Sequence, residues 1–207
     1  MPKLQLQPRK APTQERSQAM VALILEAAAR VLRQESLAGF NTNRVAAVAG
    51  ISVGSLYQYF PNKTALVVAL VGHAHDQMAA SLEGLVQSLQ GATLAQSLRA
   101  VAALAVRQQF ADPMLAAALD HEERRLPVQR GQRQARARVL AAVRKLIRQH
   151  RAELPARLPR SIAQDCLVIT KALVEAEAES GKPPPRGLAE RIARVLYGTL
   201  AAELPRR

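Results

Sequence analysis

The chain has 207 residues, of which 49% are hydrophobic and 3% aromatic, and its formal net charge is +13. A single cysteine excludes an internal disulfide framework, and no stretch offers the roughly 20 uncharged apolar residues of a membrane helix. The basic balance favours anionic partners such as nucleic acid, a membrane surface or acidic metabolites, although solvated arginine-rich faces would give the same charge.

The first segment, residues 1–12, is polar and basic and contains three prolines, which predicts a disordered arm. It has no apolar run of signal-peptide type, so we expect a protein of the reducing cytoplasm. A first helix is expected from an N-cap at Thr13 to about Ser36, because apolar residues then recur every three or four positions. The sequence LAGF should end it.

Two short helices and a long one follow. Asn41 or Thr42 caps the second helix, which runs to about Ala49, and Gly50 suits the left-handed residue that ends a helix. Ser52 caps the third, which ends at Phe60 before a proline. An asparagine, residue 62, then caps a fourth helix that runs to about residue 89.

The rest of the chain also has the pattern of helices, with no alternating strand pattern. Asp112 and Pro113 suit the start of the sixth helix, as N-cap and first helical residue. The fifth to ninth helices are expected at about 94–110, 113–126, 128–152, 161–180 and 187–203. The predicted fold is therefore all-α, with about nine helices.

The third helix has two unlike sides. At 100° per residue Val53, Leu56 and Phe60 share one side, whereas Gly54, Ser55, Gln58 and Tyr59 lie on the other. Two short helices joined by a glycine-containing turn form a helix-turn-helix, in which the second helix enters the DNA major groove. Ser, Gln and Asn side chains can read base edges, whereas hydroxyls, lysines and helix starts suit phosphate oxygens.

The run FNTNRVAAVAGISVGSLYQYFPNKTALV, residues 40–67, resembles the DNA-binding signature of the TetR family of bacterial regulators. The matching features are a threonine before the second helix, AGIS at the turn, LYQYF, and NKTAL at the start of the fourth helix. The resemblance covers about residues 14–70. Beyond them the chain matches only in being helical and of suitable length.

The resemblance implies a three-helix DNA-binding domain at 13–61, followed by a larger helical domain at 62–207 that binds an effector and dimerises. It places Thr42, Tyr57, Tyr59 and Lys63 at phosphates, and the other polar or small residues of the two short helices at or near base edges. The predicted DNA-binding set is Thr42, Asn43, Arg44, Ser52, Val53, Gly54, Ser55, Tyr57, Gln58, Tyr59 and Lys63. Arg9, Lys10 and Arg16 would add contacts from the N-terminal arm, which could equally be a solubilising tail.

The expected function is that of a homodimeric, sequence-specific transcriptional regulator. We expect a repressor that binds a palindromic operator in double-stranded DNA and is released by a small-molecule effector. The alternative is a non-specific basic DNA-binding or architectural protein. It explains the charge but not the uncharged front of the third helix.

The last two helices carry broad apolar stripes, which we expect at the interface of a homodimer, with an internal core as the alternative. The stripes comprise Ile162, Cys166, Ile169, Leu173 and Ala176, then Leu188, Ile192, Val195, Leu196 and Leu200. Weaker patterns predict an effector pocket lined by His73, Gln77, Phe110, His121 and Arg136. The alternative is that these are polar groups of the core with their hydrogen bonds satisfied. The basic helix at 128–152 is expected to be a solvated face, with membrane binding as the alternative.

The sequence gives little support for a metal site, a catalytic site or a reactive cysteine. His73 and His75 are two residues apart and face different sides of a helix, and no HExxH or paired-cysteine spacing is present. We therefore expect no metal and no cofactor. No nucleophile, base and orienting group can be recognised together, so we do not expect an enzyme. Cys166 sits among apolar residues at helical spacing, which predicts a buried, unreactive thiol.

Overall fold

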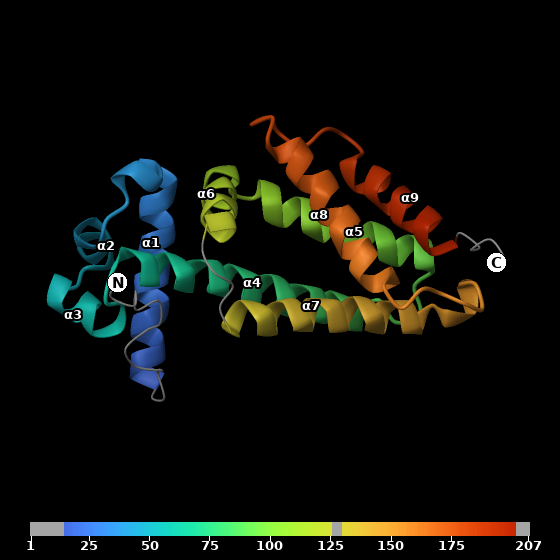
Figure 1. Ribbon diagram of the computed structural model, residues 1–207, viewed down its shortest axis with the longest axis horizontal. Helices are drawn as coiled ribbons and strands as arrows, with labels where there is room; N and C mark the ends of the chain where they lie inside the picture. Colours follow the sequence, from blue (N-terminus) through green and yellow to red (C-terminus); the bar gives the residue numbers. More distant parts are fainter. Residues whose placement is uncertain (1–14, 126–129, 202–207) are drawn as a thin grey trace. The chain divides into compact units, whose positions relative to one another are not determined.

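The computed structural model describes residues 15–125 and 130–201. Within these ranges the chain forms nine α-helices, one short 3-10 helix and no strand (Figure 1). The elements are α1 (Glu15–Gly39), α2 (Thr42–Ala49), α3 (Val53–Tyr59), α4 (Lys63–Ser88), α5 (Leu94–Phe110), α6 (Pro113–Arg125), α7 (Arg130–Gln149), η1 (Arg151–Glu153), α8 (Ile162–Ala178) and α9 (Leu188–Ala201). The predicted all-α fold is confirmed. The predicted arm and the Thr13 cap lie outside the described residues.

Asn41 separates α1 from α2 with both ends of its side-chain amide. Its Nδ2 donates to the carbonyl oxygen of Gly39 over 3.0 Å, which satisfies a carbonyl at the end of α1. Its Oδ1 accepts from the amide of Arg44 over 2.9 Å, which makes Asn41, rather than Thr42, the N-cap of α2. The first helix therefore continues three residues beyond the predicted end, because the group that ends it is this asparagine.

The turn between α2 and α3 depends on Gly50. Its φ of 67° and ψ of 30° place it in the left-handed region, where a side chain is disfavoured. The amides of Gly50 and Ile51 donate back to the carbonyl oxygens of Ala47 and Ala46 over 3.2 and 3.0 Å. Ser52 Oγ then accepts from the amide of Ser55 over 3.0 Å and starts α3.

Asn62 completes this series of local caps. Its Oδ1 accepts from the amide of Ala65 over 2.8 Å at the start of α4, as predicted.

Helix α7 ends at Gln149, three residues before its predicted end. The Arg151 guanidinium there donates to the carbonyl oxygens of the following loop, at Leu154, Pro155 and Ala156. These bonds stabilise a 3-10 turn and a loop in place of further α-helix.

The chain divides into two compact units, each with its own apolar core. Within the described ranges, the first contains the residues up to Ala74 and those from Met114 to Gln132, and the second contains the rest. The first core is built around Phe40, Leu56 and Phe60, all at most 1% exposed. In the second unit α5 packs against α8 and α9, around a separate buried cluster. The predicted domain boundary at residues 61 and 62 stays a prediction.

The apolar stripes of α8 and α9 are used differently from what the sequence led us to expect. Most of their members are buried in the core of the second unit of the same chain: Ile162, Cys166, Leu188, Ile192, Leu196 and Leu200. Side chains already buried within one chain cannot also form a contact surface for another. The expected dimer face was therefore wrong for these residues, because a helical stripe does not reveal which neighbour covers it.

Candidate nucleic-acid interface and apolar cavity

Helix α3 presents an uncharged polar surface from a firmly held backbone. Leu56 and Phe60 are fully buried and anchor the helix, whereas Gly54, Tyr57 and Gln58 are exposed. Ser52 is exposed at the helix start, and Val53, Ser55 and Tyr59 are half-buried. Such a surface can approach base edges closely and offers hydroxyl and amide groups for hydrogen bonding.

Two hydroxyl groups join α2 to α3. Thr42 Oγ1 and the Tyr57 hydroxyl lie 3.1 Å apart, which is hydrogen-bonding distance. Thr42 is buried at the start of α2, whereas the Tyr57 side chain is 40% exposed. Tyr59, by contrast, packs partly against the first core. The structure thus brings together two of the four predicted phosphate contacts, and fixes the Tyr57 ring relative to α2.

The predicted cationic contacts are already engaged with other groups of the first unit. Arg44 is exposed, and its Nε donates to Oε1 of Glu35 in α1. Lys63 is also exposed, and its Nζ lies 5.6 Å from the centroid of the Phe40 ring, within the range of a cation–π contact. Asn43 is exposed at the start of α2. These contacts orient both cations without burying them.

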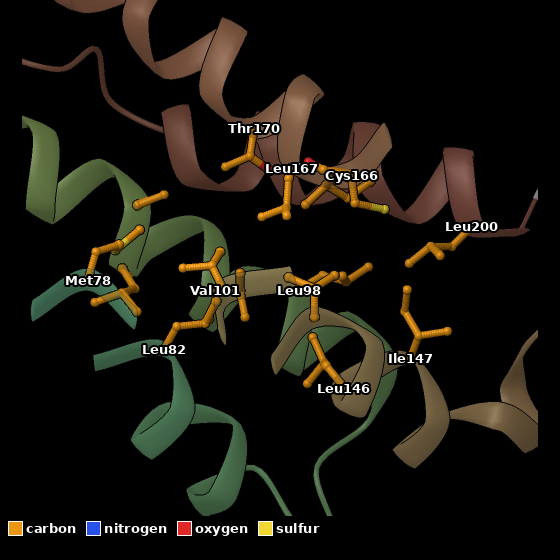
Figure 2. Close-up of a pocket in the computed structure, with 15 residues that line it drawn as sticks. Met78, Leu82, Leu98, Val101, Leu146, Ile147, Cys166, Leu167, Thr170 and Leu200 are labelled. Atoms are coloured by element: carbon orange, nitrogen blue, oxygen red, sulfur yellow. Dashed lines mark hydrogen bonds between the residues drawn. The ribbon is translucent and has the colours of Figure 1, made fainter. Parts of the chain in front are cut away.

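The second unit contains an apolar cavity of about 60 Å³, shown in Figure 2. None of the fifteen residues that line it is charged. They come from five helices: Met78, Leu82, Leu98, Val101, Leu104, Ala105, Val139, Val143, Leu146, Ile147, Cys166, Leu167, Thr170, Leu196 and Leu200. The one hydroxyl among them, Thr170 Oγ1, donates to the carbonyl oxygen of Cys166 over 2.8 Å. Burial, helped by the charge of Asp165, raises the pKa of the Cys166 thiol to about 11, so it is neutral at pH 7.

The five residues predicted to line an effector pocket lie outside this cavity. His73, Gln77, His121 and Arg136 are exposed, and Phe110 packs partly against the second core. His73 and His121 belong to the first unit. None of the five lines the cavity of Figure 2. The prediction of these pocket residues was based mainly on polar side chains. The cavity is instead lined mainly by aliphatic residues, which the sequence does not distinguish from an ordinary core.

Comparison with known proteins agrees with the helix-turn-helix. The family model described as bacterial regulatory proteins, tetR family, matches residues 24–70, which include α2, α3 and the start of α4. The match to the tetR family covers the helix-turn-helix segment, residues 24–70 of the 207 in the chain. No curated protein matches the sequence at a significant level.

Similarity to solved structures extends over the whole fold. The fatty acid degradation regulator FadR from Bacillus halodurans has a TM-score of 0.69 at 17% identity, over 86% of this chain and 98% of its own. A putative tetR-family regulator from Mesorhizobium loti has a TM-score of 0.70 at 19% identity, over 90% and 95% of the two chains. The multidrug binding protein EbrR, complexed with imidazole, has a TM-score of 0.64 at 21% identity, over 90% and 98%. At these identities the likeness concerns the fold.

The structure also contains a polar chain that the sequence pattern did not reveal, in which Ser97 and His150 are buried and Glu153 is exposed. His150 Nε2 lies 2.9 Å from Ser97 Oγ, and His150 Nδ1 lies 2.8 Å from Glu153 Oε1. The Glu153 carboxylate also accepts from the amide of Leu94, at 3.1 Å from each oxygen. The hydrogen bond from His150 and that from Leu94 lower the pKa of Glu153.

This serine, histidine and glutamate have the order of a nucleophile, a base and an orienting group. Ser97 is 0% exposed and His150 only 4%, so a substrate cannot reach Ser97 Oγ in this conformation. We assign the group a structural role, in which it ties α5 to the end of α7. Ser97 and His150 are 53 residues apart in the chain, so no local spacing could have indicated the contact.

An ion-pair cluster was also missed. Arg138 on α7 makes a bidentate salt bridge with Glu83 on α4, with N–O distances of 3.0 and 2.7 Å. Its Nη1 also donates to Asp76 Oδ1 over 3.3 Å. The contact lowers the pKa of Glu83 and raises that of Arg138. On this helix the sequence pattern had pointed to Arg136, as a pocket residue. The signal that could have corrected it is that Asp76 and Glu83, seven residues apart, share one face of α4.

Among the described residues, no group of three or more histidine, cysteine, aspartate or glutamate side chains is placed to hold a metal ion. No helix in the described ranges is both long and apolar enough to cross a membrane.

Proposed function

We propose that this protein is a cytoplasmic, homodimeric repressor of the TetR family that binds a roughly palindromic operator and is released by a small effector. The observation that carries the proposal is the exposed, uncharged front of α3 on a backbone fixed by Ser52, Gly50 and the buried Phe60. A surface meant only to neutralise phosphates would carry lysine and arginine at these positions. Hydrogen-bonding groups without charge suit base reading.

The test separates base-reading residues from phosphate contacts. Gln58→Ala should relax sequence preference, because a side chain that reads a base edge contributes about 1–3 kcal/mol of discrimination. Lys63→Ala should instead weaken binding to all sequences and reduce the salt slope by about one. Arg144→Ala is the matched control, since it removes one exposed positive charge from α7 in the second unit.

The measurement is fluorescence anisotropy with a DNA fragment found by footprinting beside the gene, at several salt concentrations. Equal losses in Lys63→Ala and Arg144→Ala would contradict the phosphate assignment, because they would show that only total charge matters. Complete displacement by a modest excess of random DNA would favour the alternative, a non-specific architectural protein.

The proposed dimer uses the outer sides of α8 and α9. Val168 on α8 is 56% exposed, and Val195 and Tyr197 on α9 are 41% and 47% exposed. Exposed apolar side chains on neighbouring helices fit a helix-pair interface with a second copy. Val168→Glu should therefore give monomers in sedimentation. Met114→Glu, at a residue of α6 that is 59% exposed, is the matched control and should leave the mass unchanged.

Coupling between effector and operator is proposed to run through α4. This one helix supplies Lys63 to the DNA-binding set and Met78 and Leu82 to the cavity. A ligand that fits better when this part of α4 is displaced would lower operator affinity. Among similar structures, EbrR is described as multidrug binding and FadR as a fatty acid degradation regulator, which supports a small-molecule effector. A compound that fills the cavity yet leaves operator affinity unchanged would refute the coupling.

A further inference from the structure

The lining of the cavity excludes charge from its ligand. No lining side chain is charged, and the only hydroxyl is already bonded to a backbone carbonyl. The thiol of Cys166 is a weak donor and acceptor. A charged or strongly polar group placed here would lose its water and find no partner, which is unfavourable.

The lining residues also indicate the shape of the ligand. Along α5 they extend from Leu98 to Ala105, and along α7 from Val139 to Ile147. At a rise of about 1.5 Å per residue these stretches measure roughly 10 and 12 Å. In Figure 2 Met78 and Leu200 lie at opposite sides of the group. A slot that follows two helices in this way fits an extended chain better than a compact ring.

The volume shows that the slot is not yet open to its full extent. It measures about 60 Å³, whereas an apolar cavity that holds benzene measures about 150 Å³. Seven of the fifteen lining residues are leucine, and these side chains, like those of Met78 and Ile147, can change rotamer. Lengthening the buried part of a ligand should therefore displace these side chains one after another.

We propose that the effector enters this cavity with an uncharged, linear hydrocarbon chain and keeps its polar end outside the slot between α5 and α7. This inference rests on the proposed function, because it names the chemical class of the proposed effector. It adds that chain length, rather than aromatic stacking or charge pairing, sets the affinity.

Primary alcohols from 1-hexanol to 1-decanol are the probes, with calorimetry on the full chain as the readout. Affinity should rise about fourfold for each added methylene, since a buried methylene contributes about 0.8 kcal/mol. 1,8-Octanediol, which carries a hydroxyl at both ends, should bind about tenfold or more weakly than 1-octanol. Benzyl alcohol tests a compact ring and should bind more weakly than 1-octanol.

Cys166 provides a second readout, because it lines the cavity and is the only cysteine in the chain. Its alkylation by N-ethylmaleimide should slow when 1-decanol is bound. Ala105→Phe should remove both the binding of 1-decanol and the protection of Cys166, because the ring fills the slot. Ala103→Phe, on the same helix but outside the lining, is the matched control and should preserve both.

Three outcomes of these experiments would contradict the proposed ligand class. Affinity that does not depend on chain length, equal binding of the diol, or unchanged binding in Ala105→Phe would overturn the inference. If Ala105→Phe does not fold, the alcohol series and the Cys166 protection in the native chain still decide. Operator affinity, measured separately with 1-decanol present, judges the proposed function. Length-dependent binding without operator release would support this ligand class and refute release by it.

Discussion

The two units of this chain are held by polar contacts of different range. In the first, the caps at Asn41, Ser52 and Asn62 each join residues three positions apart. In the second, Ser97 meets His150 across 53 positions, and Glu83 meets Arg138 across 55. The DNA-binding surface is therefore positioned largely by local geometry, whereas the helices around the cavity are positioned by contacts that form only in the folded chain.

The largest expected effect concerns the small core of the first unit. Phe60→Ala removes a fully buried ring and should lower the free energy of unfolding by about 3–5 kcal/mol. Urea denaturation followed by circular dichroism measures it. Tyr197→Ala, at a residue that is 47% exposed, should cost much less in the monomer. Equal losses would show that α3 is not anchored by Phe60.

The second prediction compares a long-range serine with a local one. Ser97→Ala leaves buried His150 Nε2 without its bonded neighbour and should cost about 1–3 kcal/mol. Ser55→Ala removes only an exposed hydroxyl bonded to Ser52 and should change stability by about 0.5 kcal/mol or less. Thermal denaturation of both variants decides. A larger loss in Ser55→Ala would reverse the comparison drawn between the units.

Two glycines should respond to alanine with opposite sign. Gly50 has a φ of 67°, so Gly50→Ala should destabilise by about 1–2 kcal/mol although no atom obstructs the new Cβ. Gly72 lies within α4 with open space beside it, so Gly72→Ala should stabilise by about 0.5–1 kcal/mol. Chemical denaturation compares them. The same sign for both would contradict the backbone argument.

The smallest expected effect is a dependence of stability on acid in the second unit. The pKa of Glu153 is lowered by His150 and Leu94, so its contribution is present above the unfolded value and lost as pH falls through the lower folded value. Glu153→Gln should therefore reduce the loss of stability below the ordinary value of 4.5. Denaturation at pH 7 and pH 3 measures it, and an unchanged difference would refute this role.

Much of the fold and of the DNA-binding set could be predicted because the relevant signals are short. An amide cap, a left-handed glycine and an apolar side of a short helix each involve neighbours within one turn. These signals gave the bounds of α2, α3 and α4 within one or two residues. What they did not reveal is that Thr42 and Tyr57 bond to each other, because the two residues are 15 positions apart.

The cavity was harder to predict for a physical reason. Aliphatic residues at helical spacing look the same whether they fill a core or line an empty space, because the difference depends on how five helices pack. Polar residues attracted attention instead, yet His73 and Gln77 point to solvent. The same limit applied to Arg138, because its contacts with Glu83 and Asp76 join residues 55 and 62 positions apart in the chain.

By itself the sequence determined the helical class, the helix-turn-helix and its TetR resemblance, because caps, glycine turns and periodicity act within a few residues. Only the tertiary structure decided which apolar stripes are internal, that Ser97, His150 and Glu153 form one polar chain, and that an uncharged slot lies within the second unit. Those features depend on distances between residues more than fifty positions apart. Such distances are set by the packing of whole helices, which no local pattern encodes.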